Sequence, residues 1–111
     1  MKNVIVISAH PDDEILGAGG TLLKHKKFGD NLAWIIITGV DEANGFTKDR
    51  VRTRELEISQ VSDSIGFSKV YKLNYPTMRL NPEIVNEMIP KISSIFIEFE
   101  PEVIYVMNRS D

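Results

Sequence analysis

The sequence predicts an α/β fold in which a parallel sheet of about four strands alternates with three helices that cover both faces of the sheet. Two patterns lead to this prediction. Short runs rich in Val and Ile lack polar alternation, which is typical of strands buried on both faces. Longer segments between them repeat apolar residues every three or four positions, as a helix does. Alternation of the two patterns indicates parallel strands joined by helical crossovers, in three layers.

The elements follow in order along the chain. The first strand is expected over Val4–Ile7 and the second over Leu32–Thr38, because both runs are β-branched and uninterrupted. A helix is expected between them over residues 15–26, with its apolar residues on one stripe. A second helix is expected over Lys48–Ile65, and a weaker third strand over Val70–Leu73. Gly29 and Gly66 follow these two helices and supply their stops.

The last helix and strand complete the alternation. Asn81-Pro82-Glu83 combines a cap, a proline for the first turn and an early acid, so the third helix is expected to start there and run to Phe99. Pro90 lies inside this pattern and is expected to kink or split the helix. The fourth strand, Val103–Met107, has no helix after it before the sequence stops at Asp111. We therefore expect the sheet to be incomplete at its carboxyl end.

Composition limits the class of protein. A length of 111 residues fits a single domain over residues 1–111. A hydrophobic share of 42% argues against disorder, and the net charge of −3 argues against a general nucleic-acid binder. No apolar run approaches the roughly 20 residues of a spanning helix, so no membrane insertion is expected. The chain has no cysteine, which excludes a zinc ribbon and fits a reducing, cytoplasmic compartment.

The segment Ala9–Glu14 carries the strongest chemical signal. It follows the first strand directly, so it belongs to the carboxyl edge of the sheet, where open α/β sheets bind ligands. His10 and Asp13 are three residues apart, which places both side chains on one side of a helical turn, and both are ordinary zinc ligands. Asp12 points elsewhere and could serve as a general base for a metal-activated water. An acidic helix N-terminus explains the acids without a metal, but not the histidine.

The run VIVISAHPDDEILGAGGTLL resembles the opening of the LmbE/PIG-L family of metal-dependent de-N-acetylases. Arg54-Glu55-Leu56-Glu57 with Ile65-Gly66 resembles the Arg-x-x-Glu helix of the same family, which closes in Leu-Gly. The resemblance implies a Rossmann-like fold and hydrolysis of the acetyl group of an N-acetylglucosamine-type substrate.

The resemblance also assigns site residues. It makes His10 and Asp13 ligands of Zn²⁺ or another divalent metal, and Asp12 the general base. It suggests Arg54 as a contact to the sugar, although a solvated helix arginine paired with nearby acids explains Arg54 equally well. The implied partner is a small-molecule N-acetyl amino sugar or glycoconjugate, with no nucleic acid and no membrane, and the oligomeric state stays open.

One departure from the family pattern concerns the third metal ligand. Family members carry an Asp-x-His-x-Asp-His segment directly after the fourth strand, and here only Asp111 resembles its first aspartate. The other histidine, His25, lies among lysines at the far end of the first helix and is expected to be a solvated surface residue. We therefore expect this chain to hold the amino-terminal portion of such an enzyme and to bind metal weakly, which leaves its activity in isolation open.

Three non-enzymatic classes of protein are the alternatives to a hydrolase. Gly17, Gly19 and Gly20 suggest a dinucleotide-binding module, but they do not form G-x-G-x-x-G and come well after the strand. A magnesium-binding receiver domain would need an aspartate at the end of the third strand, and none stands there. A purely structural fragment also remains open. Trp34 and Tyr105 lie in apolar strands and are expected to belong to the core rather than to a sugar platform.

Overall fold

The computed structural model describes residues 1–8, 19–39, 45–75 and 82–107. Within these residues strands and helices alternate, and every pair of neighbouring strands is parallel, which confirms the predicted α/β fold. The elements are β1 (Asn3–Ser8), α2 (Gly19–Lys27), β2 (Asn31–Thr38), α3 (Lys48–Ile65), β3 (Lys69–Tyr75), α4 (Pro82–Phe99) and β4 (Val103–Met107).

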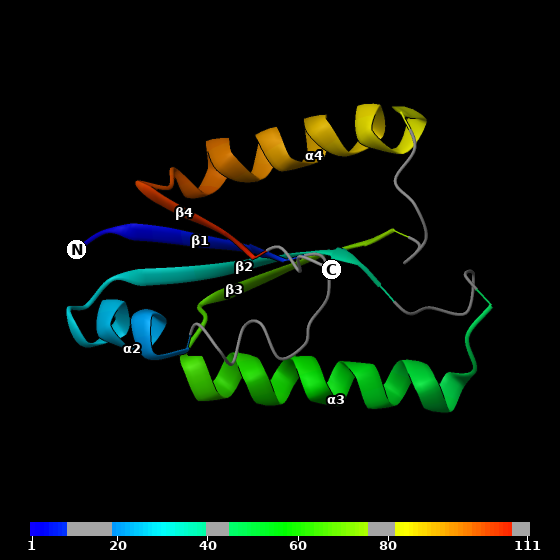
Figure 1. Ribbon diagram of the computed structural model, residues 1–111, viewed down its shortest axis with the longest axis horizontal. Helices are drawn as coiled ribbons and strands as arrows, with labels where there is room; N and C mark the ends of the chain where they lie inside the picture. The colour runs from blue at the N-terminus through cyan, green and yellow to red at the C-terminus, as the bar shows by residue number, and fades with distance from the viewer. Residues whose placement is uncertain (9–18, 40–44, 76–81, 108–111) are drawn as a thin grey trace.

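The sheet has the strand order β3-β2-β1-β4. Helices α2 and α3 cover one face of the sheet and α4 covers the other, which gives the three expected layers (Figure 1). The chain therefore adds β2 and β3 on one side of β1 and then crosses back to place β4 on the other side. The junction of β1 and β4 is the point where the strand order reverses, and ligands bind beyond the carboxyl ends of strands at such a point.

The central strands are buried on both faces because their side chains alternate between two apolar clusters. Val4 and Val6 face the α2 and α3 layer, whereas Ile5 faces the α4 layer, and all three are 0% exposed. Trp34 is also fully buried, so its expected place in the core is confirmed. The first cluster comprises Val4, Val6, Leu22, Leu32, Trp34, Ile36, Ile58 and Ile65; the second comprises Ile5, Ala33, Ile35 and Ile95.

Helix α3 has the predicted bounds because local chemistry fixes both of its ends. The hydroxyl of Thr47 accepts a hydrogen bond from the backbone N–H of Arg50 at 3.2 Å, which caps the first turn. Gly66 adopts a left-handed conformation with φ of 90°, and its N–H donates to the carbonyl of Ser62. Only glycine adopts this conformation at little cost, so the helix ends there.

Helix α4 runs through Pro90 as one helix, so of the two expected outcomes, a kink or a split, the split is wrong. Proline has no N–H to donate to the carbonyl of Asn86, one turn earlier. Both residues are exposed, which allows water to satisfy that carbonyl. Met88 and Ile95 are buried, and this apolar face supports the helix on both sides of the proline.

Strand β3 extends beyond the predicted Val70–Leu73 and ends in a close approach to β2. The pairing of the two strands is irregular between Ile36 and Thr38, and the Gly39 N–H donates to the Tyr75 carbonyl at 2.9 Å. A Cβ atom at Gly39 would lie 2.8 Å from the Cα atom of Asn74, too close for ordinary packing. This contact explains why a glycine stands at the carboxyl end of β2.

Substitution Gly39→Ala is expected to lower the free energy of unfolding by about 1–3 kcal/mol, because the backbone of β3 must move to admit the methyl group. Gly20→Ala is the matched control, since Gly20 is an exposed helical residue and a methyl group added there would meet no neighbouring atom within 4 Å. There alanine is expected to add about 0.5–1 kcal/mol of stability. Urea denaturation measures both, and an equal effect at the two glycines would contradict the assigned role of Gly39.

Candidate active site

The candidate site is framed by the carboxyl ends of β1 and β4. Ser8, the last residue of β1, pairs with Met107 at the end of β4, so the chain leaves the two strands side by side. His10, Asp12 and Asp13 follow Ser8 within five residues, and they lie outside the described residues. Their roles as metal ligands and general base therefore stay predictions, and the structure describes the framework that leads to them.

The end of β1 is held by a buried hydrogen bond. Ser8 is 2% exposed, and its Oγ accepts a hydrogen bond from the indole N–H of Trp34 at 2.9 Å. The Trp34 ring stacks on Phe67 with centroids 5.3 Å apart. Paired buried polar groups fix direction as well as position, so this contact sets where the chain leaves the sheet toward His10. The sequence marks Ser8 only as a polar residue at the end of an apolar run.

Arg54 belongs to helix α3, which begins beyond the carboxyl end of β2 (Figure 1). Its guanidinium Nη1 lies 3.4 Å from Oε2 of Glu57, one helical turn onward. The arginine side chain is 23% exposed and the glutamate side chain 48%, so this ion pair is weak. Pairing with a nearby acid, one of the two readings of Arg54, is therefore observed, and contact with a sugar stays a prediction.

Glu55, the residue directly after Arg54, is paired with a lysine of the neighbouring strand β3. Glu55 pairs with Lys72 of β3, with Oε2 and Nζ 2.8 Å apart. This pair borders a groove of about 230 Å³ between α3 and β3, whose floor includes Ile58 and Val70. The groove lies on the β3 side of the sheet, away from the junction of β1 and β4. It is therefore separate from the candidate site.

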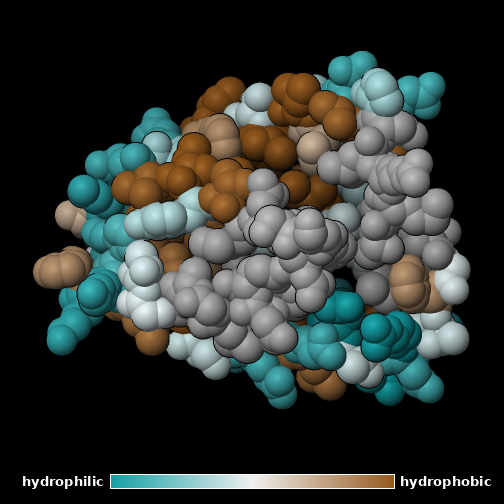
Figure 2. Space-filling model, viewed as in Figure 1, coloured by the Kyte–Doolittle hydropathy of each residue, from teal (hydrophilic) through white to brown (hydrophobic). Residues whose placement is uncertain are grey.

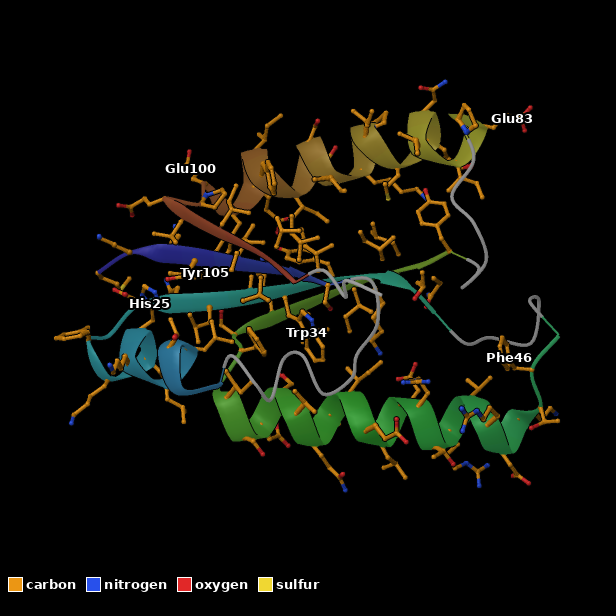
Figure 3. The ribbon with its side chains drawn as sticks, in the orientation of Figure 1. His25, Trp34, Phe46, Glu83, Glu100 and Tyr105 are labelled. Carbon is orange, nitrogen blue, oxygen red and sulfur yellow. The ribbon has the colours of Figure 1, made fainter. Side chains whose placement is uncertain are left out.

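His25 is not the solvated residue that the sequence predicted. Its side chain is 19% exposed, and both ring nitrogens are engaged. Nδ1 lies 2.8 Å from Oδ2 of Asp30, and Nε2 lies 2.8 Å from the hydroxyl of Tyr105 (Figure 3). The prediction failed because Tyr105 is 80 residues away in the chain, and only the pairing of β4 with β1 brings it to α2.

The contacts around His25 also change the pKa of the Asp30 carboxyl group. The hydrogen bond from His25, followed by that from the backbone N–H of Lys2, holds the pKa of Asp30 below its ordinary value of 3.8. Because the folded state prefers the charged carboxylate, Asp30 stabilises the fold above its ordinary pKa. That contribution is lost as the pH falls through the lowered pKa of the folded state.

Asp30→Asn is expected to lower the free energy of unfolding at pH 7 and to have a smaller effect as the pH is lowered below about 3.8. Denaturant titrations of both proteins at a series of pH values measure the difference. A difference that stays constant from pH 7 to the lowest pH at which both proteins fold would contradict the role of the charged carboxylate.

The part of the chain that the structure describes contains no candidate metal cluster. Across residues 1–8, 19–39, 45–75 and 82–107, no group of three His, Cys, Asp or Glu side chains is arranged to hold a metal ion. His25 and Asp30 lie near the amino end of the sheet, where Asn3 and Asn31 start β1 and β2. None of the described helices is both long and apolar enough to cross a bilayer.

Comparison with known proteins gives the family. The model of the GlcNAc-PI de-N-acetylase family (PIG-L) matches residues 5–111. A diacetylchitobiose deacetylase of Thermococcus kodakarensis is 28% identical over 81 residues, covering 68% of this chain and 30% of the relative. The conserved protein TT1542 of Thermus thermophilus has the same fold, with a TM-score of 0.76 and 27% identity over 100% of this chain and 48% of its own.

A solved N,N'-diacetylchitobiose deacetylase of Pyrococcus horikoshii aligns with a TM-score of 0.73 and 25% identity, over 93% of this chain and 39% of its own. The fold alone is shared with GalB, a 4-carboxy-2-hydroxymuconate hydratase of Pseudomonas putida, at 22% identity and a TM-score of 0.70 over 94% of this chain and 46% of its own. The chain thus spans half or less of the length of these proteins. Sequence motif, strand order and family model agree, and the chain belongs to the GlcNAc-PI de-N-acetylase (PIG-L) family.

Proposed function

We propose that the protein containing this chain hydrolyses the acetyl amide of an N-acetylated amino sugar with the help of a divalent metal. One observation carries the proposal: the Ala9–Glu14 segment follows β1 at the junction with β4, where the strand order reverses. Such junctions bind ligands in open α/β sheets. Family membership and the related diacetylchitobiose deacetylase support de-N-acetylation as the reaction.

The chemistry of the donors supports a metal at this place. His10 supplies an imidazole nitrogen and Asp13 a carboxylate, a combination that suits zinc. A metal bound there would supply a water of lowered pKa and polarise the acetyl carbonyl. A catalytic zinc site normally has three protein ligands, and His10 and Asp13 supply two of them. His10 and Asp13 alone are therefore expected to bind the ion weakly.

The remaining steps belong to side chains of this chain. Asp12 accepts the proton of the attacking water and returns it to the departing amine, so the carboxylate ends each cycle in its starting state. Like charges on Asp12 and Asp13 repel, and a cation close to both offsets that repulsion. Arg54, on the helix that starts at the same edge of the sheet, contacts the hydroxyl groups of the sugar. We propose zinc as the metal and an N-acetylglucosamine unit, free or in a glycoconjugate, as the substrate.

Zinc titration of the chain tests the metal site. We expect the chain to bind one zinc ion, and His10→Ala to weaken binding by more than about tenfold, because an imidazole ligand is lost. His25→Gln is the matched control: it removes the other imidazole but no proposed ligand, so its effect on zinc affinity is expected to be much smaller than that of His10→Ala. Competition with a chromophoric chelator measures the affinity, and circular dichroism checks the fold. Equal affinities of the unaltered chain and His10→Ala would refute the proposed site.

A further inference from the structure

We propose that the hydrogen-bonded chain Asp30–His25–Tyr105 is a positioning network, which fixes β4 against α2 and so sets the place of the β4 end at the candidate site. The functional importance of the β4 end rests on the proposed function. The tether itself is argued from the described residues alone.

The network joins segments that are distant in sequence. The two carboxylate oxygens of Asp30 have different partners: Oδ1 accepts the backbone N–H of Lys2 at 2.8 Å, and Oδ2 faces Nδ1 of His25 at the same distance. His25 Nε2 lies 2.8 Å from the Tyr105 hydroxyl. Asp30 also donates its own N–H to the His25 carbonyl. The start of β1, the end of α2, the start of β2 and the middle of β4 are thereby linked.

The available protons define the direction of each bond. An ionised Asp30 only accepts, so Nδ1 of His25 carries a proton. In neutral His25, Nε2 then has a lone pair and accepts the hydroxyl proton of Tyr105. When His25 is protonated, Nε2 donates to the Tyr105 oxygen instead. Protonation of His25 therefore reverses the bond to Tyr105 without breaking it.

Loss of the tether requires protonation of Asp30. The groups that face this carboxylate are His25, the backbone N–H of Lys2 and the more distant amino terminus, and all of them favour its charged form. Tyr105 faces His25 from the opposite side, with the ring planes inclined at 62°. We therefore expect the tether to weaken in acid, where Asp30 takes up a proton.

Strand β4 depends on such a tether because its packing is one-sided. Among the described strands it pairs with β1 alone. Val103 and Tyr105 pack on the core cluster that contains Trp34, whereas Ile104 is 43% exposed and Val106 60% exposed. Figure 2 shows hydrophobic side chains gathered on the surface over α4 and the neighbouring strands. With fewer apolar contacts, directional bonds account for a larger part of what holds β4 in place.

The tether lies close to the functional end of the strand. Tyr105 is two residues before Met107, which pairs with Ser8 at the exit of β1. A shift of β4 along or away from β1 would therefore change the spacing of the two chain exits. His25 and Tyr105 are therefore positioning residues: they do not lie at the carboxyl edge of the sheet, and they act on the site through the placement of β4.

Hydrogen exchange of the backbone amides tests the tether. Tyr105→Phe keeps the ring and removes the hydroxyl, and we expect the amides of Val103–Met107 to exchange about tenfold faster while those of β2 are unchanged. Tyr71→Phe is the matched control, because it removes a buried tyrosine hydroxyl from β3, which β2 and β1 separate from β4. Its removal is expected to leave β4 unaffected. Unchanged exchange in β4, or equal acceleration in β2 and β4, would overturn the proposal.

A second measurement separates positioning from general stability. The effect of Tyr105→Phe on β4 is expected to add little in an Asp30→Asn background, where the tether is already broken. An effect of Tyr105→Phe that is independent of Asp30 would overturn the network. Zinc affinity is measured in parallel: failure of the unaltered chain to bind zinc refutes the proposed metal site, and the exchange result still decides the tether.

Discussion

Trp34→Ala is expected to reduce the free energy of unfolding by about 3–5 kcal/mol, more than any other single substitution considered for stability. The indole ring is 0% exposed and lies in the cluster that joins β1 and β2 to α2 and α3. Its removal leaves a cavity that the rigid sheet cannot close, and it breaks the stacking on Phe67. Denaturant unfolding measures the loss.

Trp34→Phe separates burial from hydrogen bonding. Phenylalanine retains an aromatic ring against Phe67 but has no N–H for the hydroxyl of Ser8. We expect a smaller loss, about 1–3 kcal/mol, because a buried polar group is left unpaired. Ser8→Ala removes the other partner and is expected to cost a similar amount. If Trp34→Phe were as damaging as Trp34→Ala, the volume of the indole could not be the main source of its contribution.

Asp12→Asn is expected to abolish most turnover while metal binding is retained. A general base contributes about 10²–10⁴-fold to a rate, and asparagine has nearly the same shape but cannot accept the proton. The measurement is acetate release from an N-acetylglucosamine-type substrate by a protein of the length of the relatives, with zinc content determined on the same sample. The ratio of kcat values, rather than KM, carries the expected loss.

Glu14→Gln is the control for charge at this segment. It removes one negative charge two residues from Asp12 without touching the proposed base. We expect turnover to change by less than about tenfold, because the proposed base and both proposed metal ligands are kept. Unchanged turnover in Asp12→Asn would remove Asp12 from its role, and loss of zinc in the same variant would make Asp12 a ligand instead.

Local sequence patterns predicted the elements where local physics decides them. The β-branched runs of β1 and β2 became the most buried strands, since a strand covered on both faces has no polar positions. Thr47 and Gly66 set the ends of α3, because caps act on the backbone next to them in sequence. Pro90 does not split α4 for the opposite reason: burial of the apolar face of the helix outweighs the loss of one hydrogen bond on its exposed side.

The sequence by itself determined the alternation of elements and the α/β class, and it alone carries the prediction of a metal site in the motif after β1, because each depends on residues that are neighbours along the chain. Only the tertiary structure decided that Ser8 is anchored by Trp34, and that His25 joins Asp30 to Tyr105 rather than facing solvent. The Ser8–Trp34 and His25–Tyr105 contacts span 26 and 80 residues and exist only because parallel pairing sets β1 between β2 and β4. The partner of a polar side chain is a property of strand order and register, and no local pattern encodes it.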